Sequence, residues 1–387
     1  MACVMTGKML SRRVGRIAES ATIKMGHLAD QMKAEGKNVL NFTLGEPDFR
    51  TPEHICEAAK RALDLGYTHY TSSAGITELR EEIARKIREE NRVDVMADEV
   101  IVTPGGKQAI YEVMMSILDG GDEVILLDPC WVTFEAAVKL AGGQPRWVKR
   151  LEEKLTYEAL EAAVSEKTKM IVINSPNNPA GYVLTDNELN EVAKFAAAHN
   201  LLVLSDEIYE KIIYERRHMS IAALDGMQER TIIINGLSKT YAMTGWRIGY
   251  AIAPSEILNG MIKIQQHSVS CASSIAQYAA LTAFRASQDC VTEMAAEFKR
   301  RRDVIVKRLN AVGLRCLPPE GSFYAFINTK NHGNGMEFTE RLIKEAYIVV
   351  TPGSAFGPSG EDYVRFSFAA SMEKILEGMD RIERMLH

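Results

Sequence analysis

Short apolar runs alternate with stretches of helical periodicity along the first two thirds of the chain. The runs are nearly continuous in Val, Ile and Leu, and each ends in polar or turn-forming residues. Strands that are buried on both faces, as in a parallel sheet covered by helices, show this pattern. The predicted strands are residues 100–102, 123–127, 170–173, 201–204, 231–234 and 247–252. We therefore expect an α/β fold with a mostly parallel sheet covered by helices.

The pattern changes from about residue 287. A long charged helical stretch at 294–309 precedes short strand-like runs at 323–327, 347–350 and 364–368. This texture predicts a smaller α+β domain. We expect residues 46–286 to form a large domain and residues 1–45 and 287–387 to form the small one. Residues 10–37 are predicted to be helical.

Composition and charge exclude several classes of protein. The 387 residues carry a net charge of -5 without a basic block, so no nucleic-acid surface is expected. No apolar run is long enough to cross a bilayer, and no signal core is visible, which predicts a cytoplasmic protein. The six cysteines form no CxxC pair and the eight histidines no HExxH motif, so neither disulfides nor a metal centre is expected.

Lys239 stands in the segment with the strongest chemical signal. It directly follows an apolar run, inside a turn rich in Gly and Ser. A lone lysine there would ordinarily be a surface residue, but Arg247 follows closely and could hold a phosphate through a forked contact. A half-buried amine loses its proton readily, as nucleophilic Schiff-base chemistry requires.

Further polar groups follow other predicted strands. Asp206 ends the run at 201–204, where an acid either caps a turn or serves a site. The glycines of 103–108 open a helix whose free N–H groups attract anions, although the segment lacks the pattern of a nucleotide P-loop. The stretch 175–181 is rich in turn residues. Ligands of open α/β sheets bind beyond such strand ends.

Together these segments resemble the class I/II aminotransferases among the fold type I enzymes that use pyridoxal 5'-phosphate. The resemblance extends from about Leu10 to the C-terminus and is closest to the bacterial and archaeal aspartate aminotransferases. Its motifs are residues 45–49, Tyr70, 105–107, 128–131, 178–181, 206–209, 238–239 and 364–367. Each motif is weak alone, but their order over the whole chain is specific.

The resemblance implies a role for each residue around the cofactor ring. Lys239 would bind the cofactor covalently and then carry a proton. Asp206 would pair with the pyridine nitrogen and keep it protonated. Tyr209 and Asn178 would hydrogen-bond the ring oxygen, and Trp131 would stack on the ring. The plainer alternative for Trp131 is a core residue.

The resemblance also implies a phosphate site shared between subunits. Gly106, the backbone of Lys107, Ser238 and Arg247 would bind the phosphate. Tyr70 would reach the phosphate of the neighbouring subunit, which implies a homodimer. Tyr70 could also be an ordinary surface aromatic residue.

For the substrate, the resemblance assigns the α-carboxylate to Arg365, assisted by Asn178 and the backbone of Gly45. A structural ion pair is the plainer alternative for Arg365. Two positions depart from the common family pattern: Ala180 replaces a Thr, and Gly236 replaces a phosphate-binding Ser. Phosphate binding would then depend more on Arg247.

The identity of the amino acid depends on Lys107. The stretch 265–270 lacks the arginine that aspartate aminotransferases of the other subgroup use for the distal carboxylate. Lys107, with Thr22 in the family-like stretch 19–22, is the candidate for binding an acidic side chain. We expect transfer between aspartate and 2-oxoglutarate. If Lys107 serves only phosphate or solvent, an aromatic or broad-specificity aminotransferase is favoured.

Reactions and roles of other classes fit the sequence less well. A pyridoxal-phosphate-dependent lyase would not need the complete pair of Arg365 and Asn178. A cofactor-sensing regulator would need a DNA-binding domain, and no helix-turn-helix pattern is visible. A catalytically dead scaffold would not be expected to keep Lys239, Asp206 and Arg247.

Overall fold

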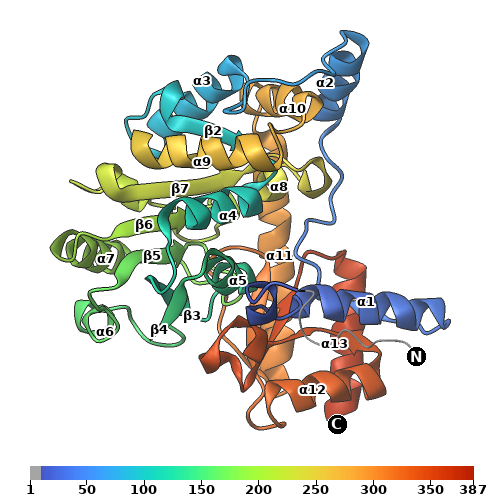
Figure 1. The fold of residues 1–387 in the computed structure, drawn as a ribbon. Helices are drawn as coiled ribbons and strands as arrows, with labels where there is room; N and C mark the ends of the chain where they lie inside the picture. The colour runs from blue at the N-terminus through green and yellow to red at the C-terminus, as the bar shows by residue number, and fades with distance from the viewer. Residues whose placement is uncertain (1–9) are drawn as a thin grey trace, which may run out of the picture.

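A seven-stranded sheet forms the centre of the molecule in the computed structural model, which describes residues 10–387 (Figure 1). The strand order is β2-β8-β7-β6-β5-β3-β4, and β8 alone runs antiparallel to its neighbours. The strands are β2 (Val100–Thr103), β3 (Glu123–Asp128), β4 (Gln144–Lys149), β5 (Thr168–Asn174), β6 (Leu202–Asp206), β7 (Thr231–Gly236) and β8 (Gly249–Ile252). The expected mostly parallel α/β sheet is therefore confirmed.

Helices cover both faces of this sheet. Consecutive β3 residues belong to different apolar clusters, Leu126 on one face and Ile125 on the other, as strand geometry requires. One face is covered by α4 (Gly106–Ile117), α5 (Val132–Ala141) and α9 (Ser255–Ser268). The other is covered by α6 (Tyr157–Glu161) and α7 (Asp186–Ala198). A third cluster, beside β2 and β8, contains α2 (Glu53–Asp64), α3 (Thr77–Lys86) and α10 (Ser274–Arg285).

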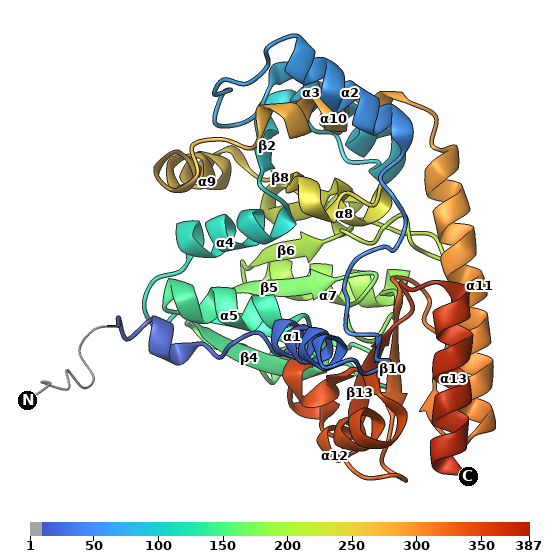
Figure 2. The same ribbon diagram turned by 90° about the vertical axis from the view of Figure 1, so that its right-hand side faces the viewer.

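A smaller antiparallel sheet, in the order β12-β13-β10-β9, lies below the large one in Figure 1. Its strands are β9 (Arg315–Cys316), β10 (Tyr324–Asn328), β12 (Thr351–Pro352) and β13 (Tyr363–Ser367). Its helices are α11 (Asp289–Ala311), α12 (Gly335–Arg341) and α13 (Met372–Leu386). In Figure 2, α11 runs from the level of the large sheet down beside α13. The predicted domain limits at 46 and 286 agree with this distribution of strands but stay a prediction.

The N-terminal segment joins the smaller sheet region. β1 (Leu40–Asn41) pairs in parallel with β11 (Ile348–Val349). Only α1 (Ala21–Ala34) is a regular helix in the stretch 10–37, so the longer predicted helix was wrong. Residues 1–9, with Cys3, lie outside the described residues. The other five cysteines are free thiols.

Three strand predictions needed correction. Of the run at 347–350, only Ile348 and Val349 form a strand, β11, and the next strand, β12, begins at Thr351 in a different sheet. The run at 247–252 becomes a strand only at Gly249, because Arg247 has a left-handed backbone with φ of 55°. β4 was not predicted, since it contains Pro145 and alternates in exposure at the edge of the sheet. Within residues 10–387, no helix is both long and apolar enough to span a bilayer.

Candidate active site

The polar ends of the strands meet in a cavity of about 500 Å³. It lies at the carboxyl ends of β5, β6 and β7, and residues of α1, α4 and β13 complete its wall. The predicted site residues that line it are Gly45, Gly106, Lys107, Trp131, Asn178, Asp206, Tyr209, Ser238, Lys239, Arg247 and Arg365. Residues from most of the length of the chain thus converge on one cavity.

Tyr70 is the predicted site residue that does not line this cavity. It is 88% exposed on the loop between α2 and α3. A ring with so much exposed surface contributes little to the packing of a single subunit. Its assignment to a neighbouring subunit stays a prediction.

Lys239 lies in α8 (Leu237–Thr240), the short helix that follows β7. Its Nζ donates a hydrogen bond to the carbonyl oxygen of Gly45, which fixes the amine at the cavity wall. Burial lowers the pKa of Lys239 to about 8, because the charged form loses water; Glu46 opposes this shift, and Arg247 adds to it. At pH 7 about a tenth of the amine is therefore neutral, far more than for an exposed lysine, and the neutral form is the nucleophile.

Asp206 is the last residue of β6 and is 3% exposed. Its Oδ1 accepts a 3.1 Å hydrogen bond from the backbone N–H of Ile208, so the side chain both caps a turn and lines the cavity. Burial raises the pKa of Asp206 to about 7, and the charge of Glu207 adds to the rise. A positive group in the cavity would reverse this rise by stabilising the carboxylate.

Tyr209 and Tyr324 join their hydroxyl groups at the base of the cavity. The two oxygens lie 3.0 Å apart, and Tyr324 comes from β10 of the smaller sheet. Tyr324 was within a predicted strand but was not identified as a site residue. The available signal was a tyrosine in an otherwise apolar buried run, because such a hydroxyl needs a partner.

Arg365 is a buried cation, 2% exposed, in the middle of β13. Its Nη1 donates to Oδ1 of Asn178 at 3.0 Å, and its Nη2 donates to the carbonyl oxygen of Thr43 at 2.7 Å. Its Nε has no partner, and within residues 10–387 no carboxylate pairs with this guanidinium. The structural ion pair that was the plainer alternative for Arg365 is therefore not formed among these residues.

Arg247 is held against the start of α4. Its guanidinium donates to the carbonyl oxygens of Thr244, at 2.8 Å, and Pro104, at 3.3 Å. Gly105 has a φ of +86°, and a side chain there would overlap the guanidinium. The first N–H groups of α4, from Gly106 onward, and Arg247 thus surround a position suited to an anion.

Lys107 and Trp131 lie together where α4 meets α5. The Lys107 ammonium is 5.0 Å from the centre of the Trp131 ring, a cation–π distance. Partial burial, reinforced by Arg247, lowers the pKa of Lys107. Thr22 of α1 lines the same cavity, and its hydroxyl lies 3.0 Å from that of Ser20.

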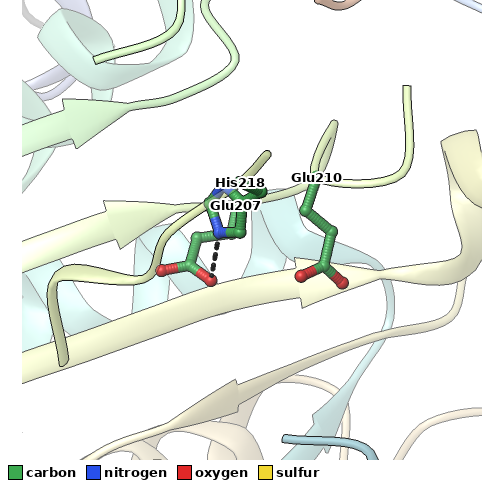
Figure 3. Close-up of side chains that lie close together, drawn as sticks. All are labelled: Glu207, Glu210 and His218. Atoms are coloured by element: carbon green, nitrogen blue, oxygen red, sulfur yellow. Dashed lines mark hydrogen bonds and ion pairs between the residues drawn. The ribbon is translucent and has the colours of Figure 1, made fainter. Parts of the chain in front are cut away.

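Glu207, the residue after Asp206, lies close to Glu210 and His218 in a buried polar cluster (Figure 3). Glu207 accepts hydrogen bonds from His218, at 3.0 Å, and from Ser220, at 2.6 Å. Glu210 pairs with Lys86. The ligand atoms of Glu207, Glu210 and His218 lie within 4.8 Å of one another, close enough for a metal ion. Since Lys86 pairs with Glu210 while His218 and Ser220 hydrogen-bond Glu207, we interpret the group as structural contacts that fix the chain after β6.

Residues 37–382 match the family model for aminotransferases of class I and II. The chain belongs to this family. Enzymes of this aminotransferase family move amino groups between amino acids and oxo acids and generally use pyridoxal phosphate.

Relatives of the aminotransferase carry two different substrate names. This chain is 45% identical over 385 residues to an aspartate aminotransferase of Pyrococcus abyssi, with 97% of this chain and 98% of the relative covered. It is 44% identical to aromatic-amino-acid aminotransferase 2 of Thermococcus litoralis, with the same coverage. Among solved structures, the aspartate aminotransferase of Thermus thermophilus with maleate superposes with a TM-score of 0.95 at 40% identity, covering 98% of this chain and all of the other.

Proposed function

We propose that this aminotransferase uses pyridoxal 5'-phosphate to transfer the amino group between aspartate and 2-oxoglutarate. The observation that carries the proposal is Arg365, a buried guanidinium with an unpartnered Nε and no carboxylate partner among residues 10–387. Burying a cation without an anion is costly, so the cavity is built for a carboxylate that arrives with the substrate.

The residues of the cavity fit the chemical groups of pyridoxal phosphate. Arg247, Ser238 and the N–H groups from Gly106 onward would bind its phosphate. Asp206 is buried, and no cation pairs with its carboxylate among residues 10–387. It would pair with the protonated pyridine nitrogen. Tyr209 would bind the ring oxygen with Asn178, and Trp131 would cover the ring. When bound, the cofactor accepts the electrons released as the substrate Cα loses its proton.

Lys239 would be the base of this reaction. Its Nζ would hold the cofactor and, once freed by the amino group of the substrate, would take the proton from the substrate Cα. The lowered pKa of Lys239, about 8, keeps the amine available to take that proton. Hydrogen bonding to the Gly45 carbonyl directs Nζ along one wall of the cavity.

Two cations would recognise the two carboxylates of a dicarboxylic substrate. Arg365, beneath Asn178, would bind the α-carboxylate in a forked contact. Lys107 lies next to Trp131 and would bind the side-chain carboxylate, with Thr22 nearby. Both aspartate and 2-oxoglutarate carry a second carboxylate, which explains a lysine at this place.

An aromatic or broad-specificity aminotransferase is the second candidate. The relative from Thermococcus litoralis is named for aromatic amino acids at almost the same identity as the aspartate enzyme. Lys107 would then bind only the oxo acid, and the stem of Lys107 with the apolar Ile23 of α1 would accept the aromatic ring.

Lys107→Ala separates these two candidates. We expect kcat/KM for aspartate to fall roughly 100-fold and that for tyrosine to change less than threefold, because an ion pair to a substrate carboxylate in a partly buried site contributes a few kcal/mol. Lys263→Ala, an exposed lysine on α9, is the matched control and should change neither. Equal losses for both amino acids would exclude Lys107 as the specificity residue.

Spectroscopy tests the cofactor and the half-reaction directly. The purified protein should show a yellow absorption band that aspartate bleaches without any oxo acid. A band that only tyrosine bleaches would keep the aminotransferase and move the substrate to the aromatic class. We also propose a homodimer in which Tyr70 reaches the phosphate site of the partner.

A further inference from the structure

The loop that carries Tyr70 is bound tightly to the body of the protein although Tyr70 itself projects into solvent. The carbonyl oxygen of Ala74 accepts a 2.9 Å hydrogen bond from Val102 of β2. Gly75 has a φ of +101°, and a side chain there would overlap Val102. The loop therefore runs against the sheet at a distance that only glycine allows.

Gln277, in α10, is the central anchor of this loop. Its side chain is fully buried. Its Oε1 accepts from the backbone N–H of Ile76 at 2.8 Å, and its Nε2 donates to the hydroxyl of Thr71 at 2.9 Å and to the carbonyl oxygen of Ala272. One amide thus joins Thr71, the residue after Tyr70, to the C-terminal end of the loop at Ile76 and to the helix.

Gln265 of α9 provides a second buried amide. It is also fully buried, and its Nε2 donates to the carbonyl oxygens of Ser73 and Val102. It lies in the stretch 265–270, where the sequence lacked an arginine for the distal carboxylate. The structure gives the position another use, because its side chain points into its own subunit to hold the loop.

The other side of Tyr70 is anchored as well. The ring of Tyr67 stacks on Tyr278 of α10 with centroids 4.1 Å apart, and Ser274 donates to the Tyr67 carbonyl oxygen at 2.8 Å. Tyr70 lies between these anchors and is 88% exposed. Because the backbone is already fixed, the exposed ring can insert into another surface without the entropic cost of ordering the loop.

We propose that Gln277, assisted by Gln265, is a positioning residue for Tyr70, which it holds ready for the phosphate site of a second copy of this chain. The inference rests on the proposed function, which assigns Tyr70 to the partner's cofactor phosphate. Gln277 touches neither substrate nor cofactor and acts only through the loop.

The test is a double-mutant cycle on cofactor affinity. Holoenzyme is diluted, and the fraction of pyridoxal phosphate that stays bound is followed by its visible absorption. We expect Tyr70→Phe to weaken binding roughly tenfold and Gln277→Met roughly threefold to tenfold, because each removes hydrogen bonds that support the phosphate contact. The double variant should bind no more weakly than Tyr70→Phe alone, since both changes act through one contact.

Gln288→Met is the matched control. The side-chain amide of Gln288 accepts a hydrogen bond from the Tyr241 hydroxyl and donates to the carbonyl oxygens of Ala283 and Ala286, and it does not contact the loop. It should leave cofactor affinity unchanged even where it lowers the melting temperature. Thr71→Val replaces Gln277→Met if that variant does not fold, because it removes the same contact from the loop side.

The outcomes separate the inference from the function beneath it. If Tyr70→Phe weakens binding but Gln277→Met and Thr71→Val match the control, the positioning role is wrong and the shared site stands. Additive losses in the double variant would also overturn the positioning role. If Tyr70→Phe leaves the affinity unchanged, the contact between subunits is itself wrong, and the inference falls with it.

Discussion

Nη1 of Arg365 donates a 3.0 Å hydrogen bond to Oδ1 of Asn178, and this bond joins the four-stranded sheet to the segment that follows a strand of the seven-stranded sheet. Asn178 follows β5 of the large sheet, whereas Arg365 lies in β13 of the small one. The backbone N–H of Asn178 is bound in turn to Oδ1 of Asn174, at the end of β5. The guanidinium is therefore oriented by the same segment that lines the cofactor side of the cavity.

Arg365→Lys should separate substrate binding from cofactor binding. A lysine ammonium cannot keep the bond to Asn178 and also offer a fork to a carboxylate, so we expect kcat/KM to fall roughly 100-fold to 1,000-fold. The yellow band should persist, because Arg365 does not serve the cofactor. Arg315→Lys, an exposed arginine of β9, is the control in steady-state assays. Unchanged kcat/KM in Arg365→Lys would contradict the α-carboxylate assignment.

The pKa of Lys239 should appear in the pH dependence of cofactor capture. Burial lowers that pKa to about 8, so the neutral, nucleophilic amine becomes dominant above this pH. In the cofactor-free protein, the rate of covalent capture of pyridoxal phosphate should rise with pH and level off above about pH 8. Stopped-flow absorption measures this rate, and Lys239→Ala should show no covalent capture and no turnover. A rise that continues toward the pKa of an exposed lysine would refute the burial argument.

Gly105→Ala should weaken cofactor binding through Arg247. The added methyl group would meet the guanidinium, and the φ of +86° is itself unfavourable for alanine. We expect roughly tenfold weaker binding of pyridoxal phosphate, since a charge-assisted contact to the phosphate is displaced. Gly121→Ala is the control, because its φ of +98° has the same strain but open space around it. Equal affinities of the two variants would show that Arg247 can move without loss.

Glu112→Gln should stabilise the protein at neutral and higher pH. The carboxyl of Glu112 is fully buried in α4, its Oε2 has no partner, and burial raises its pKa to about 7. Because the folded pKa exceeds the unfolded one, ionisation costs stability progressively as pH rises from about 4.5 to about 7. The gain in unfolding free energy should reach at most about 3 kcal/mol above pH 7 and vanish below about pH 4.5.

Urea denaturation at about pH 5 and about pH 8 measures this difference. Glu158→Gln, an exposed glutamate of α6, should be neutral at both pH values. A gain for Glu112→Gln that does not grow with pH would mean that the carboxyl is charged in the folded protein at all these pH values.

The large sheet could be predicted because its central strands are buried on both faces. Continuous apolar runs such as those of β5 and β6 indicate buried parallel strands when helical stretches separate them along the chain. The edge strand β4 was missed because it lacks this pattern: half of its residues face solvent. β1 and β11 have two residues each and exist only through their mutual pairing, which no local pattern reveals.

The site was predictable to a similar degree, and the gaps have physical causes. Residues that follow strands, such as Asp206 and Lys239, could be found because strand ends collect ligands in this type of sheet. Tyr324 was missed because its role depends on contacts with Tyr209, which is 115 residues away in sequence, and with Arg365, which lies on the neighbouring strand. The structure of one chain leaves the role of Tyr70 a prediction, because that role belongs to a second subunit.

The active site must form in a fixed order during synthesis. This order follows from the pairing of β1 with β11 and from the position of Arg365 in β13. During synthesis, every strand of the large sheet has been made once Ile252 is added, and Asp206, Lys239 and Arg247 are then all present. Leu40 can pair only after Ile348 has been made, and Asn178 can bind Arg365 only after Arg365 has been made. The substrate-binding side of the cavity therefore forms last. Because domains fold as they emerge, a nascent chain gains its anion and ring contacts before it can hold an amino acid.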